Sequence, residues 1–404
     1  MIIEGKHAKA EIFTENIEEQ ALQWVQKLCD HPAFQGMKIV QMPDVHAGNS
    51  CNVGTAYRIG AYLNPDHVGG DIGCTISMHR LSIPVSPEDF KVLDHRIREV
   101  MPTGKNICAK NSLNEKEFFK FLTAQYRKAR SAAPELIDEI PRIDARFISD
   151  FCRRIKLQEG IFYKSIGSLG GGNHFVEYGE DTATGVGWLT IHCGSRNLGT
   201  KVAAHWHNIA NNPKRADMVG FLWGDAMNGY LSDMVIAQAY ALYNHHVIRD
   251  RIFAILKKLN KAKCEESIFT THNYIDVTEE NPILRKGAIY AGEGTKLAIP
   301  FNMRDGIAIC IGKGNADWLN TAPHGAGRLL SRAQAKKQVS IDEFKKTMSG
   351  IFSTSIGEGT LDESPQAYKP MEEILTLIAP TVEVIALVQP KLNIKDPGEL
   401  IFNI

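Results

Sequence analysis

The spacing of hydrophobic residues along the chain predicts both helices and strands. A helix is expected to begin after Thr14, where apolar residues recur on one face of a 3.6-residue period, at Ile17, Ala21, Val25 and Leu28. Residues 87–156 are predicted to be mostly helical, with breaks at prolines and glycines. Residues 225–259 form the longest stretch with helical spacing. Helices are therefore expected to dominate the middle of the chain.

Short apolar runs predict the strands. They lie at residues 37–42, 188–191, 268–271, 306–311 and 382–388. The first is expected to end in a turn at Pro43, and two others run directly into His192 and His272. The elements follow no regular β-α-β alternation, and no repeat or linker divides the sequence. We therefore expect an α+β fold with mixed β-sheets at its core and helices around them, in one domain over residues 1–404.

The composition narrows the class of protein. Of 404 residues, 44% are hydrophobic and 23% charged, which is typical of a globular protein and excludes collagen-like, coiled-coil and disordered chains. No apolar run approaches the ~20 residues of a membrane span, and residues 1–13 lack the apolar core of a signal peptide. We expect a soluble, cytoplasmic protein with no membrane partner, whose eight scattered cysteines are reduced.

The net charge bears on nucleic-acid binding. The chain has 46 basic and 46 acidic side chains and hence no net charge. This balance argues against a protein that coats nucleic acid through bulk charge, but it leaves room for a local basic groove.

Reactive side chains concentrate in glycine-rich segments. The segments are PDVHAG at 43–48, GGDIGC at 69–74, GSLGGGNHFVE at 167–177, IHCGSR at 191–196, THN at 271–273 and PHGAGR at 323–328. Glycine allows backbones to approach one another closely, so such segments can aim side chains at a shared point.

Five side chains in these segments have the chemistry of metal ligands: Asp71, Cys74, His174, His192 and His272. Five ligands exceed what one tetrahedral site needs, so they favour a two-metal site, which in phosphoryl transfer clamps the attacking and leaving oxygens. Taken singly, each histidine is more often a buried residue bonded to backbone, and the cysteine a small core side chain. Thiol and imidazole ligands favour zinc over manganese by softness, but the spacing does not decide the metal.

His324 suggests a second chemical role. A helix is predicted to begin close to it, because residues 327–337 include many helix formers. A helix N-terminus attracts phosphate and favours a neutral imidazole, as a histidine attacking a nucleotide α-phosphate requires. The alternative is that Gly325 and Gly327 form a tight turn and that His324 caps the helix. The residues alone leave the two interpretations evenly matched.

Taken together, these segments resemble the RtcB family of RNA-splicing ligases. The resemblance covers most of the chain, with motifs in family order: MPDVH at 42–46, VGGDIGC at 68–74, GSLGGGNHFVE at 167–177, IHCGSR at 191–196, HN at 272–273, RKGA at 285–288, HGAGRLLSR at 324–332, SPQAYK at 364–369 and QPKLNIK at 389–395. One such run would say little, whereas so many in order are very specific.

The resemblance implies a ligase that joins an RNA 2′,3′-cyclic phosphate or 3′-phosphate end to a 5′-hydroxyl end, using GTP and two Mn²⁺ ions. It implies that His324 is the catalytic nucleophile and forms a histidine–GMP intermediate, from which GMP passes to the RNA 3′-phosphate. The positions that match the family's metal ligands are Asp71 and His174 for one ion and His192 and His272 for the other, with Cys74 bridging both.

By the same resemblance, a larger set of residues holds the guanylate. It comprises Asn173, His174, Phe175, Val176, Glu177, His272, Asn273, His324, Gly325, Ala326, Gly327, Tyr368 and Lys395, together with Gly312 and Lys313 of a nucleotide loop. Arg196 and Arg328 are expected to neutralise phosphate oxygens, and Asp44 to orient the metal ligands.

Two segments depart from the family's pattern. Gly48-Asn49-Ser50 replaces Gly-Lys-Gly, and the nucleotide loop reads Ile311-Gly312-Lys313-Gly314-Asn315, in a shortened stretch, where the family has Pro-Gly-Ser-Met-Gly. All the matching metal ligands and the nucleophile are retained, so we expect activity in a short, divergent paralogue. Such branches are associated with the repair of cleaved RNA, including transfer or ribosomal RNA, beside a release-factor homologue or protein activator.

Two other functions compete with the ligase. A metal-dependent RNA-end phosphodiesterase or phosphatase would keep the metals without joining ends, and the altered nucleotide loop favours it. A non-catalytic RNA-end sensor would be expected to lack the nucleophile or a ligand, and none is missing. Elsewhere, the pair His245–His246 is interpreted as a helical face with no metal role.

Overall fold

The strands that the structure describes form three sheets. Residues 1–212, 218–277 and 282–398 are described by a computed structural model. A six-stranded sheet has the order β1 (Ile2–Glu4), β2 (Lys9–Ile12), β3 (Lys38–His46), β4 (Val53–Arg58), β10 (Ile283–Lys286) and β9 (Tyr274–Asp276). A seven-stranded sheet has the order β12 (Lys296–Pro300), β13 (Ile307–Gly312), β15 (Val382–Lys395), β6 (Phe175–Asp181), β7 (Gly187–Cys193), β5 (Thr75–Leu81) and β8 (Cys264–Thr271). The short strands β11 (Ala288–Tyr290) and β14 (Thr321–Pro323) pair with each other.

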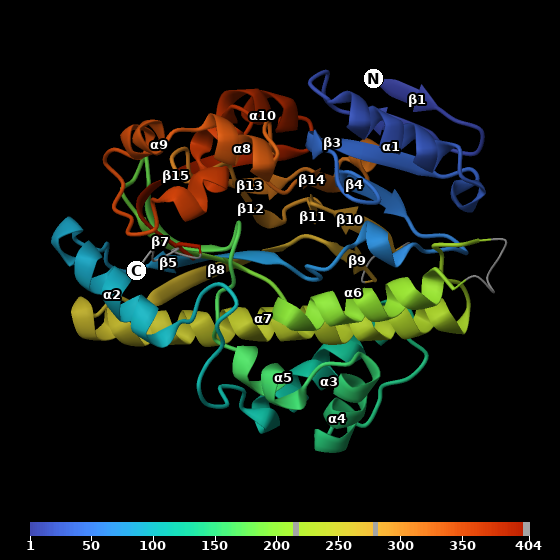
Figure 1. Ribbon diagram of the computed structural model, residues 1–404, viewed down its shortest axis with the longest axis horizontal. Helices are drawn as coiled ribbons and strands as arrows, with labels where there is room; N and C mark the ends of the chain where they lie inside the picture. The colour runs from blue at the N-terminus through green and yellow to red at the C-terminus, as the bar shows by residue number, and fades with distance from the viewer. Residues whose placement is uncertain (213–217, 278–281, 399–404) are drawn as a thin grey trace.

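Helices cover the sheets above and below. They are α1 (Glu19–Cys29), α2 (Phe90–Val100), α3 (Glu115–Ala132), α4 (Ala145–Arg154), α5 (Glu159–Ser165), α6 (Arg196–Ala210), α7 (Asp225–Leu259), α8 (Arg332–Gln338), α9 (Ile341–Thr347) and α10 (Met371–Ile378). In Figure 1, α6 and α7 run beneath the sheets with α3, α4 and α5 below them, and α8, α9 and α10 lie above. Within the described ranges, no helix has the length and apolar character needed to cross a membrane.

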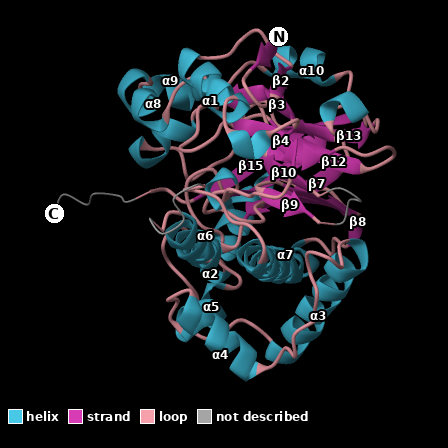
Figure 2. Ribbon diagram, turned by 90° about the vertical axis from the view of Figure 1, so that its right-hand side faces the viewer, coloured by secondary structure: helices cyan, strands magenta, loops and turns pink. Residues whose placement is uncertain are grey.

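The long helix α7 lies between two layers. Its 35 residues span about 52 Å at 1.5 Å per residue. The sheets cover it from above, and α3 packs against it from below (Figure 2). Successive residues such as Val235, Ile236 and Ala237 are therefore all buried, as in a helix that is apolar on every side.

The α+β class predicted from the sequence is confirmed, and so are the bounds of the longest helix. The predicted strands are present, several of them longer than expected. Some predicted boundaries were wrong. The first helix begins at Glu19 and leaves out Ile17, and β3 continues past Pro43 to His46. Its pairing with β4 is irregular between Gln41 and His46, and such an irregularity accommodates a proline, which has no N–H to donate.

Strand register in the seven-stranded sheet brings distant residues into one row. Lys395 of β15 is opposite Phe175 of β6. Phe175 is in turn opposite His192 of β7, and His192 is opposite Ile76 of β5. Because side chains alternate along a strand, the members of one row face the same side of the sheet. The polar members of this row belong to the candidate site.

Candidate active site

Five side chains with metal-binding atoms meet at one end of the seven-stranded sheet. Asp71, Cys74 and His174 form one group, and Cys74, His192 and His272 form another; within each group the ligand atoms lie within 4.8 Å of one another. Cys74 Sγ is 3.2 Å from His192 Nε2 and 3.5 Å from His174 Nε2. Cys74 belongs to both groups, as a thiolate that bridges two ions would.

The sheet register explains why these residues meet. Thr75, the first residue of β5, is opposite Cys193 of β7 on one side and Thr271 of β8 on the other. Cys74 directly precedes Thr75, and its carbonyl accepts a hydrogen bond of 2.8 Å from the backbone N–H of His272. The Cys74 thiol and the imidazoles of His192 and His272 therefore sit at the ends of adjacent strands.

Backbone carbonyls orient two of the imidazoles. His174 Nδ1 lies 3.0 Å from the Leu169 carbonyl oxygen, and His192 Nδ1 lies 3.1 Å from that of Asn173. Because a carbonyl only accepts, each Nδ1 carries a proton, so Nε2 is the atom of each ring that a cation would bind. The Nδ1 of His272 is buried with no hydrogen-bond partner among the described residues. Such a buried, unpaired polar atom fits a site that a cation would complete.

The charges of the group also suit cations. Burial lowers the pKa of His192 and His272 well below the usual value, so both rings are neutral. Burial raises the pKa of the Cys74 thiol, which a bound cation would reverse. Burial also opposes ionisation of Asp71, but His174 outweighs it and lowers the pKa of that carboxyl to about 2. Neutral imidazoles beside a carboxylate and a thiol fit divalent ions.

His324 lies beside this cluster and is held by Asp44. Its Nδ1 is 2.6 Å from Asp44 Oδ2, and its ring centroid is 5.0 Å from that of His272. The predicted helix start at His324 was wrong, because this residue directly follows β14 and α8 begins only at Arg332. In between, Gly327 has a φ of +74°, and a Cβ there would lie 2.2 Å from the Asp44 carbonyl oxygen. A buried carboxylate therefore contacts His324, and no helix begins at this residue.

A cavity of about 330 Å³ opens beside His324 and has the size of a small-ligand site. Its lining includes most of the residues that the sequence predicted for a guanylate: Asn173, Phe175, Glu177, His272, Asn273, His324, Gly325, Ala326, Gly327, Tyr368 and Lys395. His174 faces the metal-binding group instead.

Besides His174, three residues of the same prediction do not line this cavity: Val176, Gly312 and Lys313. Val176 lies between Phe175 and Glu177 on β6, and so its side chain packs into the apolar core on the opposite face. Gly312 ends β13, and the exposed Lys313 donates a hydrogen bond of 2.6 Å from its ammonium to the Ala379 carbonyl. The altered nucleotide loop therefore lies outside the cavity lining.

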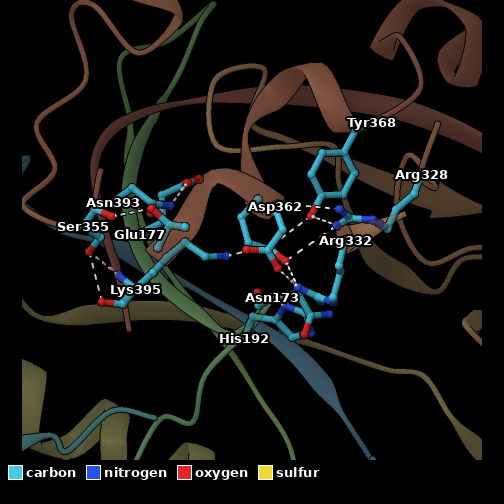
Figure 3. A network of polar contacts seen from close by, with 12 residues as sticks. Asn173, Glu177, His192, Arg328, Arg332, Ser355, Asp362, Tyr368, Asn393 and Lys395 are labelled. Atoms are coloured by element: carbon cyan, nitrogen blue, oxygen red, sulfur yellow. Dashed lines mark hydrogen bonds and ion pairs between the residues drawn. The ribbon is translucent and has the colours of Figure 1, made fainter. Parts of the chain in front are cut away.

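A network of charges forms one wall of the cavity. Glu363, 3% exposed, accepts from the Tyr368 hydroxyl at 2.8 Å and from the Lys395 ammonium at 3.2 Å, and it pairs with Arg332. Burial opposes its ionisation, but Lys395 and then the arginines outweigh burial and lower its pKa to about 2. Arg328 donates to the Tyr368 hydroxyl at 3.2 Å. In Figure 3, Lys395 extends across the cavity wall toward Arg332 and Tyr368.

A second polar pair faces the same cavity. Asn393 Nδ2 donates to Glu177 Oε2 at 2.8 Å, as their opposite positions on β15 and β6 allow. Burial raises the pKa of Glu177 to about 8, although Asn393 and Lys395 oppose the shift. Asn393 Oδ1 is buried and has no partner within the described chain. These atoms are available to the edge of a bound base.

Three residues of the cavity wall were not predicted from the sequence: Arg332, Glu363 and Asn393. Arg332 lies inside the HGAGRLLSR motif and Glu363 directly precedes SPQAYK, so motif membership was the available signal. Asn393 lies inside the QPKLNIK motif, and its register opposite Glu177 shows the role that the motif alone did not. Arg196, expected at a phosphate, instead donates to the Gly104 carbonyl at 2.7 Å and to Ser168 Oγ at 3.1 Å.

Comparison with known proteins gives one consistent result. The family profile described as tRNA-splicing ligase RtcB matches residues 25–396. The chain is 27% identical over 372 residues to the RNA-splicing ligase RtcB of Escherichia coli K12, covering 86% of this chain and 87% of that protein. It is 26% identical over 400 residues to the tRNA-splicing ligase RtcB of Nanoarchaeum equitans, covering 83% of each. It is 23% identical over 412 residues to the RNA-splicing ligase RtcB2 of Escherichia coli ATCC 25922, covering 95% and 93%.

Proposed function

The chain belongs to the tRNA-splicing ligase RtcB family, and from this premise we propose that it is an RNA ligase that uses GTP and Mn²⁺. It would join RNA 2′,3′-cyclic phosphate or 3′-phosphate ends to 5′-hydroxyl ends through a histidine–GMP intermediate. The observation that carries the proposal is the position of His324, held by Asp44 in a cavity that also contains His192 and His272.

Two cations fit the ligand groups of this chain. Asp71, Cys74 and His174 would hold one ion, and Cys74, His192 and His272 the other. When bound, such ions supply Lewis acidity and neutralise charge on phosphate oxygens. The choice of Mn²⁺ follows the family resemblance, since the softness of thiolate and imidazole ligands alone would favour zinc.

His324 performs the first step. Asp44 accepts the Nδ1–H of His324, so the Nε2 lone pair is free to attack the α-phosphorus of GTP. A P–N bond forms, the P–O bond to the β-phosphate breaks, and pyrophosphate leaves. The carboxylate also stabilises the positive charge that the ring acquires during attack.

The remaining steps return His324 to its starting state. A 2′,3′-cyclic end first takes up water and opens to a 3′-phosphate. An oxygen of that phosphate attacks the phosphorus on His324, the P–N bond breaks, and the RNA end becomes linked to GMP. The 5′-hydroxyl then attacks the RNA phosphate, a phosphodiester forms, and GMP leaves with the electron pair of the broken P–O bond.

The cavity wall supplies groups for the nucleotide. The Lys395 ammonium lies 5.6 Å from the centroid of the Phe175 ring, so a cation and an aromatic face adjoin. Glu177 and Asn393 present polar atoms to a base, and Arg328 can pair with phosphate oxygens. Lys313 is left out of this set because it does not line the cavity.

The proposed setting is RNA repair in the cytoplasm. Transfer or ribosomal RNA with 3′-phosphate or cyclic and 5′-hydroxyl ends would be the substrate, with a release-factor homologue or other protein activator as a partner. Support comes from the two departures from the family's motifs, which affect Asn49-Ser50 and residues 311–315 and leave the ligand set intact.

The test is covalent labelling with α-³²P-GTP and Mn²⁺. The wild type should retain label through denaturing electrophoresis, α-³²P-ATP should give none, and His324→Ala should give none. Labelled wild-type protein should then seal an RNA with a 3′-phosphate to one with a 5′-hydroxyl. Absence of label in wild-type protein shown to contain bound Mn²⁺ would overturn the ligase proposal and favour an RNA-end hydrolase or a sensor.

A further inference from the structure

Two polar residues are completely buried in the middle of α7. Asn244 and His245 have no exposed surface, although most of this helix packs apolar side chains. His245 was interpreted from the sequence as part of a helical face with no metal role. It lies on α7, on the face that packs beneath the seven-stranded sheet, and it is in neither ligand group. Burying polar groups is unfavourable unless each is hydrogen-bonded, so their partners identify their role.

Asn244 binds the start of the loop that carries His174. Its Oδ1 accepts from the backbone N–H of Gly167 at 2.6 Å, and its Nδ2 donates to the Ser168 carbonyl at 3.1 Å. The same Nδ2 lies 3.5 Å from Cys193 Sγ. One amide therefore bridges the glycine-rich loop and β7, using both its donor and its acceptor.

His245 binds the two strands that carry Cys74 and His192. Its Nε2 lies 3.0 Å from the Cys193 carbonyl oxygen, and its Nδ1 lies 2.8 Å from Ser77 Oγ. A carbonyl only accepts, so Nε2 carries the proton and Nδ1 accepts from the Ser77 hydroxyl. Burial lowers the pKa of His245 to about 4, which agrees with this single neutral tautomer.

The direction of these bonds continues to the edge of the sheet. Ser77 donates to His245, so its oxygen accepts from His79 Nε2, 3.1 Å away. His79 Nδ1 then accepts from Ser267 Oγ at 2.8 Å on β8. One ordered chain of hydrogen bonds thus links β8, β5, α7 and β7, and every proton in it has one position.

We propose that Asn244 and His245 are positioning residues that set the spacing of the metal ligands Cys74, His174 and His192. Cys193 directly follows His192, and Ser77 lies three residues after Cys74 on β5. One rigid helix thereby contacts all three ligand-bearing segments on the side of the sheet away from the cavity. The inference rests on the proposed function, since it assumes that these ligands bind cations.

The neighbouring residue His246 supplies a matched control. It lies on the same helix and is half-buried, and in the described part of the chain its ring contacts are with Phe121 and Phe269 at centroid distances of 5.6 Å. His246→Ala removes an imidazole from the same turn of α7. Within the described chain it loses ring packing on Phe121 and on Phe269 of β8, but no hydrogen bond to the segments that carry Cys74, His174 or His192.

The experiment measures metal affinity by titrating Co²⁺, and separately Mn²⁺, into purified full-length variants. In the Co²⁺ titration, the near-ultraviolet absorption from thiolate to Co²⁺ reports binding at Cys74. His245→Ala and Asn244→Ala should weaken metal binding roughly 10- to 100-fold, the usual effect of removing a group that orients a metal ligand. His245→Gln should recover most of the affinity, because its amide can donate to the Cys193 carbonyl. His246→Ala should stay within about twofold of the wild type, since it orients no ligand.

The outcomes distinguish a failure of the positioning role from a failure of the proposed ligase function. If His245→Ala and Asn244→Ala are folded by circular dichroism and bind metal with wild-type affinity and absorption, the positioning role is overturned while the ligase proposal stands. If only the unfolding temperature changes, the contacts are structural and the positioning role is likewise overturned. If the wild type binds no ion, the metal chemistry of the proposed function fails, and the positioning role fails with it.

Discussion

His324 Nδ1 lies 2.6 Å from Oδ2 of Asp44, a carboxylate with no exposed surface. The two residues are 280 positions apart in the chain and meet because the turn after β14 packs against β3. At Gly327 the backbones approach so closely that a side chain would not fit. Asp44 was expected from the sequence to orient the metal ligands, whereas the structure places it against His324, where it fixes the tautomer of that ring.

Asp44→Asn should slow GMP transfer to His324 without weakening metal binding. The amide keeps the shape of the carboxylate but loses its charge, so it neither enforces the Nδ1–H tautomer nor stabilises the ring as charge develops. We expect the rate of label incorporation from α-³²P-GTP to fall roughly 10- to 100-fold. Mn²⁺ affinity is the control, because Asp44 is in neither ligand group. An unchanged labelling rate would show that Asp44 does not act on His324.

Because Cys74 belongs to both ligand groups, Cys74→Ala and His272→Ala should lower the metal content of the protein to different extents. Cys74→Ala removes a ligand from each group and should lower occupancy at both positions. His272→Ala removes a ligand from one group and leaves Asp71, Cys74 and His174 in place, so it should retain about one ion per chain if each group holds one. Inductively coupled plasma mass spectrometry after Mn²⁺ loading measures the ratio. Equal losses in the two variants would contradict a bridging role for Cys74.

Glu363 should make the free energy of unfolding depend on pH. Its pKa in the folded protein, about 2, is lower than the ~4.3 of an unfolded glutamate. The carboxylate therefore stabilises the fold above the unfolded value, and that contribution is lost as pH falls from about 4.3 toward 2. At pH 7, Glu363→Gln should cost roughly 3–5 kcal/mol, because Lys395 stays buried without its partner.

Urea unfolding between pH 3 and pH 7 tests this prediction. The difference in free energy of unfolding between wild type and Glu363→Gln should shrink as the pH falls. Glu358→Gln, at an exposed position in the same segment, is the control and should change stability by less than about 0.5 kcal/mol. A difference that is constant with pH would mean that the charge of Glu363 is not what stabilises the fold.

Much of the fold followed from local patterns. Helix α7 is long and strongly apolar, so its bounds were predictable, and the short β-branched runs located most strands of the large sheet. The end of β3 was not predictable, because Pro43 terminates most strands and is accommodated here only by an irregular pairing with β4. The helix predicted at His324 failed for a related reason, since Gly327 serves a close approach to Asp44 of β3.

The candidate site was only partly visible in the sequence. Motif resemblance selected Asp71, Cys74 and the three histidines, and the structure brings these side chains together. Their assignment as ligands of two Mn²⁺ ions stays a prediction. Glu363 and Asn393 were missed because their roles depend on contacts across strands and between distant segments. Val176 was included because a contiguous motif was carried over whole, although alternate residues of a strand face opposite sides.

Two lysines that resemblance placed together should behave differently. Lys395 is buried at the cavity wall beside Phe175, so Lys395→Ala should raise the GTP concentration needed for half-maximal labelling roughly 10- to 100-fold, the usual value of a charged hydrogen bond. Lys313 is exposed and bonded to Ala379, so Lys313→Ala should change it by less than about twofold. The comparison of the two titrations is the measurement. A strong effect of Lys313→Ala would show that the altered loop closes over the nucleotide.

Gly327→Ala should disrupt both the stability and the chemistry of the site. Gly327 has a φ of +74°, and its Cβ would lie 2.2 Å from the Asp44 carbonyl oxygen, so the turn after His324 would have to move away from β3. Substitution at Gly327 combines backbone strain from the positive φ with a steric clash against Asp44. Gly350 separates the two effects, because it has a φ of +89° but nothing within 4 Å of its Cβ. Gly350→Ala should cost only the conformational strain, about 1 kcal/mol, and leave GMP labelling unchanged. Gly327→Ala should cost roughly 3 kcal/mol or more and reduce labelling sharply, because Asp44 and His324 are forced apart. Equal effects of the two substitutions on unfolding and labelling would refute the close approach as the reason for glycine at position 327.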